Sequence, residues 1–268
     1  MRLSNESLIV LKNFAAINSN IYIRKGNMIN TVHSLKNMFA TARINDEFPV
    51  DFGIYDLNEF LSVLSLHKDD LQLDIEDVNI LVSGKHGRSK IKYRTCPEYM
   101  FKRNAADEKT IFDVKINIDE KSFAVDFELS QDDFKWILDT ANVLGTPHIS
   151  IQSDGKHVTM NCLDLQNDSA HTESLELDVP CNGDEFDFTF KTEFISKFLL
   201  GTYQIKLKSD APLIMYMKNK NFPLEYWITT ETNSYYRNKD ELKPSPVVNI
   251  PTPQDDDDFV YDDDDAPF

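Results

Sequence analysis

The chain has 268 residues, of which 41% are hydrophobic, so it is long enough for two domains that each bury a core. Its formal net charge is -17, and residues 244–268 contribute eight Asp and no Lys or Arg, which leaves -9 on residues 1–243. No stretch approaches the roughly 20 apolar residues of a membrane span. The apolar run at 8–11 is too short for an ordinary signal peptide. The three cysteines lie far apart and form no CxxC pair, which indicates the reduced thiols of a cytosolic protein.

The first part of the chain alternates helical and strand-like segments. Ser4 is an N-cap residue, and apolar residues follow it at helical spacing. A second amphipathic helix is predicted over 56–66, with Asp56 at its start. Gly26-Asn27 is typical of a hairpin turn. The predicted strands span 21–24, 28–32, 38–44, 50–55, 71–75, 79–82 and 90–94.

Residues 96–111 break this pattern, and we interpret them as a connector between two domains. They hold Pro97, an apolar cluster of Tyr99, Met100 and Phe101, and a charged run. Such a segment would cross the surface between two folded units.

The second part of the chain restarts at Phe112 with the same kinds of element. Ser130 is the N-cap of a helix with apolar residues on one face, and Gly145 lies just past its end. Another helix is predicted over 192–200. The predicted strands span 148–152, 157–162, 173–178, 186–190, 203–208, 213–218 and 224–229.

The order of elements therefore occurs twice. The N-cap residues Ser4 and Ser130 lie 126 positions apart, and Asp51 and Asp187, which each begin a strand that leads into a helix, lie 136 positions apart. Similar offsets indicate two related domains in tandem, with chance similarity of apolar helices as the alternative. We predict an α+β fold with domains at 1–95 and 112–232, each packing two helices on one face of antiparallel sheets.

The end of the chain differs in character from the rest. Four prolines precede two Asp quartets, 255–258 and 262–265, which flank Phe259-Val260-Tyr261. Few apolar residues and dense like charge cannot offset the entropy cost of ordering a chain. A disordered acidic tail is therefore predicted over 233–268.

Signatures of catalysis are missing from the sequence. Gly84-Lys85 is not a phosphate loop, because Asn79 stands where the motif needs Gly and His86 where it needs Ser or Thr. The six histidines form no metal-binding pair, and the acidic run at 255–258 lacks the fixed geometry of a cation site. We expect no enzymatic activity, no metal and no cofactor, which favours a binding or scaffold role.

Three segments carry a resemblance to a known family. They read MRLS at 1–4, LKNFAAINS at 11–19 and IYDLNEFLSVLSL at 54–66. Together they resemble the sliding clamp of T-even-type bacteriophages, a DNA polymerase accessory protein. In the second domain the resemblance lies mainly in the repeated architecture. It extends over roughly residues 1–232, and the acidic tail departs from it.

The resemblance implies the DNA-clamp fold and a homotrimeric ring, joined head to tail, with helices lining the hole. Such a ring encircles duplex DNA without sequence specificity and tethers the viral DNA polymerase and other partners. An ATP-driven clamp loader opens it, and the late-transcription machinery contacts it, in the cytoplasm of the bacterial host and without a membrane. An acidic chain suits this role, because topological linkage needs no tight phosphate binding and screening limits repulsion to roughly 8 Å at physiological salt.

A modest cationic lining of the hole would suffice, so lysines on or beside the predicted helices are candidates for contact with DNA. Each has an alternative interpretation as an ordinary solvated lysine. The candidates are Lys12, Lys68, Lys135, Lys191 and Lys197.

Two further sets of residues are candidates for partner binding. In clamps of this type, partners insert an apolar peptide beneath the connector, which points to Tyr99, Met100 and Phe101; these residues could instead pin the connector to the body. Phe259 and Tyr261 form a candidate docking element of the tail, with a merely solubilising tail as the alternative.

Two other classes of protein stay open. A soluble interaction protein with a DNA-mimicking acidic tail would differ from a clamp in its mass in solution. An enzyme of an unrecognised class would show turnover without partners.

Overall fold

The computed structural model describes residues 1–67, 70–76, 78–101, 122–167 and 169–241. Lys68, the connector after Phe101 and the acidic tail from 242 onward, with Phe259 and Tyr261, lie outside the described residues. In the described part of the chain, no helix is long and apolar enough to cross a membrane.

The first half of the chain forms its elements in the predicted order. The Ser4 side chain caps α1 by accepting a hydrogen bond from Ser7 N, and Asp56 caps α2 by accepting one from Glu59 N. The elements are α1 (Asn5–Ile17), β1 (Ile21–Ile23), β2 (Gly26–Val32), β3 (Met38–Phe48), β4 (Phe52–Ile54), α2 (Leu57–Ser65), β5 (Gln72–Ile75), β6 (Asn79–Gly84), β7 (Ser89–Arg94) and the 3-10 helix η1 (Glu98–Phe101).

The second half repeats this pattern after one additional strand. Ser130 caps α4 by accepting from Asp133 N, and Gly145 ends the helix at φ 66°, where glycine has no steric cost. The elements are β8 (Phe123–Leu129), α4 (Gln131–Leu144), β9 (His148–Asp154), β10 (Val158–Leu163), β11 (Glu173–Leu177), β12 (Glu185–Lys191), α5 (Thr192–Ile195), β13 (Tyr203–Lys208), β14 (Ile214–Asn219), β15 (Leu224–Thr229) and β16 (Tyr235–Arg237).

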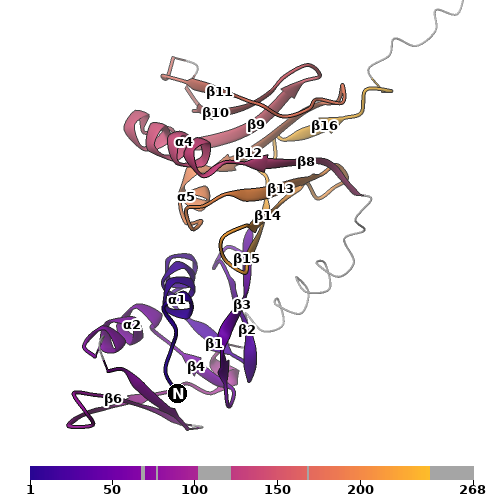
Figure 1. The fold of residues 1–268 in the computed structure, drawn as a ribbon. Coiled ribbons are helices and arrows are strands. Elements are labelled where there is room, and N and C mark those ends of the chain that lie inside the picture. Colours follow the sequence, from indigo (N-terminus) through magenta and orange to yellow (C-terminus); the bar gives the residue numbers. More distant parts are fainter. Residues whose placement is uncertain (68–69, 77, 102–121, 168, 242–268) are drawn as a thin grey trace, which may run out of the picture.

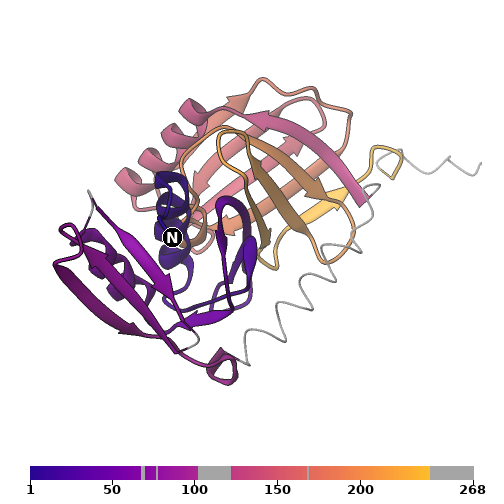
Figure 2. The ribbon, with the colours of Figure 1, turned by 60° about the horizontal axis from the view of Figure 1, so that its bottom comes forward.

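One antiparallel sheet joins the two halves. Its order is β2-β3-β15-β14-β13-β8, and at the junction Leu224 lies opposite Ala42 and Ile228 opposite Met38. The other sheets have the orders β1-β4, β5-β6-β7 and β11-β10-β9-β12-β16. A continuous hydrophobic core runs through both halves, and α1 lies where they meet (Figures 1 and 2). The predicted α+β class is confirmed.

The repeat is visible in the strand pairing. β1 pairs with β4 as β9 pairs with β12, and β2 pairs with β3 as β10 pairs with β11. In each half a helix and a three-stranded meander follow, β5-β6-β7 in the first and β13-β14-β15 in the second. The boundaries predicted for the two domains stay a prediction, because most of the connector lies outside the described residues.

The predicted hairpin at Gly26-Asn27 is wrong. Gly26 is the first residue of β2, where it lies opposite Phe48 with φ 113°, and β1 pairs with β4 rather than with β2. Glycine is used here because this φ is strained for other residues. It lets the chain leave one sheet and enter another.

The helix predicted over 192–200 begins at Thr192 as predicted, but its predicted end is wrong, because α5 ends at Ile195. The amides of Lys197 and Phe198 bond to carbonyls only three residues back. Leu199 N donates to the Tyr226 hydroxyl, and the Tyr203 hydroxyl donates to Leu199 O. Partners from β13 and β15 thus replace the helical hydrogen bonds that would continue α5.

The folded chain continues past the predicted end of the second domain at 232. β16 pairs with β12, and the Tyr236 hydroxyl donates to Asp184, which also accepts from Lys239 N. This strand is short and lies far from its partner in sequence, so no local pattern marks it as part of a sheet.

Candidate functional site

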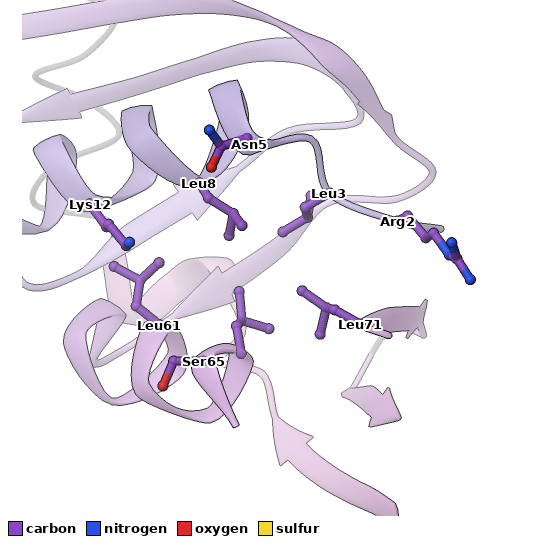
Figure 3. A pocket seen from close by; sticks show the side chains of 9 residues that line it. Arg2, Leu3, Asn5, Leu8, Lys12, Leu61, Ser65 and Leu71 are labelled. Carbon is purple, nitrogen blue, oxygen red and sulfur yellow. The ribbon is translucent and has the colours of Figure 1, made fainter. Parts of the chain in front are cut away.

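Lys12 lies on the exposed side of α1, as predicted. It lines a groove of about 370 Å³ between α1 and α2 that is otherwise mostly built of leucines. Figure 3 shows Lys12 at one end of the groove and Arg2 at the other. Arg2 forms a salt bridge of 3.5 Å with Asp70. Lys12 is therefore a solvated cation on a helix surface, which is the setting that contact with DNA requires.

The other described lysine candidates lie in different settings. Lys135 is exposed on α4 but forms an ion pair with Asp139, which raises its pKa and offsets its charge. Lys191 ends β12, and its ammonium group lies 6.0 Å from the centre of the Phe194 ring. Lys135 and Lys191 therefore contribute less positive charge to the helix surface of the second half than the sequence predicted.

Lys197 lies at the junction between the two halves, and the expected helix surface does not exist there. Its ammonium group lies 3.0 Å from His33 Nε2 and 5.7 Å from the centre of the Phe194 ring. Burial and the charge of Lys197 lower the pKa of His33, so the imidazole is neutral and can accept from the ammonium. Lys197 is thus held between elements and is half-buried.

A buried hydrogen-bond network holds α1 against the second half. Asn13 Nδ2 donates to Lys197 O at 2.8 Å, and the Tyr226 hydroxyl donates to Asn13 Oδ1 at 2.7 Å. The Tyr226 hydroxyl also accepts from Leu199 N at 3.1 Å. Sequence analysis missed this network because its members are far apart in the chain.

The apolar cluster at the start of the connector divides into two kinds of residue. Phe101 is buried against Gly53, and its ring centre lies 5.7 Å from that of Tyr22. Phe101 therefore pins the connector to β1 and β4, and the expectation that it offers surface to a partner is wrong. Tyr99 and Met100 are exposed and keep that candidate role.

A second apolar cluster lies on the face of the joining sheet that points away from the main core. Strand alternation places it there, since the neighbouring residues of each strand belong to the main core. Phe39 and Trp227 meet across the junction with ring centres 5.4 Å apart. The outer cluster consists of Val32, Phe39, Ile214, Trp227 and, partly buried, Tyr216. Period-2 alternation was the one signal in the sequence that could have found it.

The strands β7 and β11 are sheet edges of opposite charge. Residues 85–94 hold five Lys or Arg and no Asp or Glu, and the exposed side of β7 carries Lys90, Lys92 and Arg94. Within the described ranges, these three cations form no salt bridge. On β11 and just after it, Glu176 and Asp178 are exposed. These edges are charged surfaces open to another chain.

Solved structures share this arrangement of helices and sheets. Proliferating cellular nuclear antigen from Entamoeba histolytica superposes with a TM-score of 0.57 at 15% identity, covering 84% of this chain and 95% of that one. The DNA polymerase III subunit beta from Pseudomonas aeruginosa has a TM-score of 0.57 at 13% identity, covering 84% of this chain and 62% of that one. The class of protein is therefore defined by its fold, the DNA clamp.

Proteins of related sequence identify the family within the DNA-clamp class. Residues 4–97 match the family model of the DNA polymerase processivity factor. The sliding clamp of Vibrio phage KVP40 is 30% identical over 233 residues, which is 86% of this chain and 99% of the relative. That of Escherichia phage RB69 is 30% identical over 238 residues, 87% of this chain and 98% of the relative. The chain belongs to the family of T-even-type phage sliding clamps, and the predicted family, fold and function as a processivity factor are confirmed.

Proposed function

We propose that three copies of this chain close head to tail into a ring that encircles duplex DNA and tethers the viral DNA polymerase. The observation that carries the proposal is the junction inside the chain. There the last strand of the second meander, β15, pairs with β3, the strand that follows β2. The strands at the same places in the other half are β7 and β11, and both are edges in the described part of the chain. Pairing β7 of one copy with β11 of the next is a heterologous contact that can close into a ring.

The side chains of the two edges support this pairing. On the solvent side Lys90, Lys92 and Arg94 of β7 would meet the acidic side of β11, where Glu176 and Asp178 lie. On the core side Ile91 and Tyr93 already pack against the main core, as does Leu175 of β11. An antiparallel pair would extend the core and neutralise the exposed charges at the same time.

The exposed side of α4 is a second contact of this junction. Counting from the two N-cap serines, Trp136 and Val143 of α4 correspond to Val10 and Ile17 of α1. Val10 and Ile17 are 0% and 4% exposed on the helix that contacts the second half through Asn13, whereas Trp136 and Val143 are 54% and 82% exposed. The next copy would cover this pair as the second half covers α1.

Trp136 is expected to become protected from acrylamide quenching as the ring closes. Its signal is isolated in a Trp227→Phe variant, since the chain has two tryptophans. We expect a blue shift and a severalfold loss of quenching between nanomolar and micromolar protein, because an indole that leaves water becomes inaccessible. Ring closure without any change at Trp136 would remove α4 from the junction.

The mass of the protein in solution tests the ring itself. Multi-angle light scattering on the full chain should give about three times 30.9 kDa at micromolar concentration. A monomer at all concentrations, with no ring in electron micrographs, would leave an interaction protein with an acidic tail as the better assignment.

Lys12 is the described lysine best placed for contact with DNA. Lys12→Glu with Lys135→Glu should lower processive synthesis severalfold at near-physiological salt, because it removes positive potential from two helix surfaces without touching the core. The mass of the ring should stay the same. Lys25→Glu is the control, because it makes the same reversal of charge at one exposed residue that lies outside the helices. Equal processivity of the three proteins would reject the assignment.

Tyr99 and Met100 are expected to contribute to partner binding, unlike Phe101. Tyr99→Ala with Met100→Ala should weaken binding of the polymerase about tenfold and leave unfolding unchanged, because both side chains are exposed. Phe101→Ala should instead lower the free energy of unfolding by about 3–5 kcal/mol, as for a buried aromatic residue. Polymerase titration and urea unfolding separate the two effects, and unchanged polymerase affinity of the double variant would exclude this segment.

Other assignments rest on the family alone. We infer a clamp loader driven by ATP, contact with the late-transcription machinery and location in the bacterial host cytoplasm. No catalytic role is proposed. Loading assays with purified loader and DNA, and co-purification from infected cells, test these partners.

A further inference from the structure

We propose that the groove between α1 and α2 is a docking site for an acidic segment of a partner protein, which inserts an aromatic side chain between the two helices. Leucines form the walls of this groove, and Arg2 and Lys12 lie at its two ends (Figure 3). The groove lies within one copy of the chain, so the inference goes beyond the proposed ring and does not depend on it.

The helix on one side of the groove carries a smaller residue than its counterpart in the second half. Counting from the two N-cap serines, Leu8 of α1 corresponds to Phe134 of α4. Leu8 is half-buried beside the groove, whereas Phe134 is fully buried. The same count places Leu138, which packs against the main core, where the first half has Lys12. The second half thus places more apolar volume at both positions.

The strand that follows the second helix of each half shows the same difference. Residue 1 exchanges backbone hydrogen bonds with Leu73, as its counterpart in β8 pairs with Ile205 of β13. Leu71 and Tyr203, each two positions earlier, therefore correspond. Tyr203 is fully buried, and its ring centre lies 5.5 Å from that of Phe134. Two buried aromatic rings thus occupy the place that the first half leaves as a groove.

An aromatic side chain of another protein would fill the same space. The groove has a volume of about 370 Å³, which is near the lower end of the roughly 300–1,000 Å³ of ligand pockets. It therefore suits one or two side chains rather than a large cofactor. Aromatic side chains bury the most apolar area per residue, and one such anchor dominates the energy of a small interface.

The charges around the groove specify the neighbours of that aromatic side chain. The lining includes two cations and no acidic residue, in a chain that has 45 acidic and 28 basic residues. Lys12 is exposed and forms no salt bridge with the residues that the structure describes. The salt bridge between Arg2 and Asp70 is solvent-exposed and contributes little. Carboxylates on either side of the aromatic anchor would meet both cations, so the partner segment is acidic.

The acidic tail of this chain is the alternative occupant. It follows β16 in the sequence, and β16 lies at the opposite end of the molecule from α2 in both views (Figures 1 and 2). A segment of another protein needs no connection across that length. The placement of the two elements therefore favours a partner.

A selection of random peptides tests the groove without knowledge of the partner. Random dodecapeptides displayed on filamentous phage are selected on the full-length chain, and the enriched sequences are synthesised with a fluorescent label. We expect these sequences to place Phe, Tyr or Trp next to Asp or Glu. Leu8→Phe, which adds the ring that the second half already has, should weaken binding at least tenfold. Lys12→Glu should weaken it severalfold at 50 mM NaCl and less at 500 mM NaCl.

Matched changes outside the groove are the controls. Leu35→Phe, at a residue that is 66% exposed, and Lys25→Glu, at another exposed residue, should bind the peptides as wild type does. The urea midpoint of Leu8→Phe should not fall, because the added ring enters open space. A lower midpoint would contradict the proposal, since it would mean that no ring fits there.

The other outcomes also decide the matter. A selection that yields no acidic peptides with an aromatic residue overturns the proposal, as do peptides that bind Leu8→Phe and Lys12→Glu as tightly as wild type. Tighter binding to Phe259→Ala with Tyr261→Ala than to wild type assigns the groove to the tail, and the partner is then rejected. None of these results depends on trimers, so the mass measurement judges the proposed ring separately.

Discussion

Reversing two cations of the β7 edge, Lys90→Glu with Arg94→Glu, is expected to leave the chain folded and prevent ring closure. Both side chains are exposed and form no salt bridge within the described residues, so the fold loses little. In the ring they would face Glu176 and Asp178 of the next copy, and the change places like charges opposite each other. A cost of about 2 kcal/mol at each junction, roughly 30-fold, acts at every junction of the ring.

The head-to-tail arrangement supplies a sharp control for this result. Adding Glu176→Lys and Asp178→Lys to the same chain restores opposite charges at every junction, so assembly should return. Lys25→Glu with Lys218→Glu, which makes the same change of net charge away from both edges, should assemble as wild type. Light scattering reads assembly, and primer extension on long templates reads processivity. Trimers of the β7 variant at wild-type concentrations would place the junction elsewhere.

The sequence predicted those parts of the fold whose signals are local. Ser4, Asp56 and Ser130 each cap a helix through the side-chain hydrogen bond that their position predicts. Gly145 adopts the left-handed conformation expected just past a helix. The order of strands followed from alternation, because each strand buries one face against the shared core.

The failures have a common physical cause. The segment after Thr192 has the apolar spacing of a helix, but Tyr203 and Tyr226 supply hydrogen bonds from other strands and end the helix early. Gly26 has the composition of a turn, yet pairing with Phe48 places it in a strand. In both cases contacts with residues far away in the sequence determine the local structure, and the pattern of a single sequence carries no information about such contacts.

The candidate site was predictable in its parts but not in its arrangement. Lys12 was placed correctly because it sits on the polar side of an amphipathic helix. Lys197 was predicted on a helix surface, but the helix ends before it. Phe101 and Met100 are both apolar, so residue type alone could not show that Phe101 is buried and Met100 is exposed. The basic residues of β7 and the acidic residues of β11 can be recognised in the sequence, but only the sheet topology shows that these strands lie at sheet edges.

The joint between the two halves depends on a tyrosine hydroxyl that is buried with its partners. Burial raises the pKa of Tyr226, so the group stays protonated and can donate to Asn13 while it accepts from Leu199 N. Asn13 in turn donates to Lys197 O, so one hydroxyl links α1, the turn after α5 and β15.

Tyr226→Phe should therefore destabilise the protein by about 2–4 kcal/mol, because Asn13 Oδ1 and Leu199 N each lose the hydrogen-bond partner that the buried hydroxyl supplies. The ring of the side chain stays, so the loss measures the hydroxyl alone. Tyr55→Phe, on an exposed tyrosine, removes the same atom with an expected change below about 0.5 kcal/mol. Urea unfolding with a double-mutant cycle including Asn13→Ala should give a coupling of at least about 1 kcal/mol. Additive losses would mean that the two side chains act independently, and a Tyr226→Phe protein as stable as wild type would show that water replaces the hydroxyl.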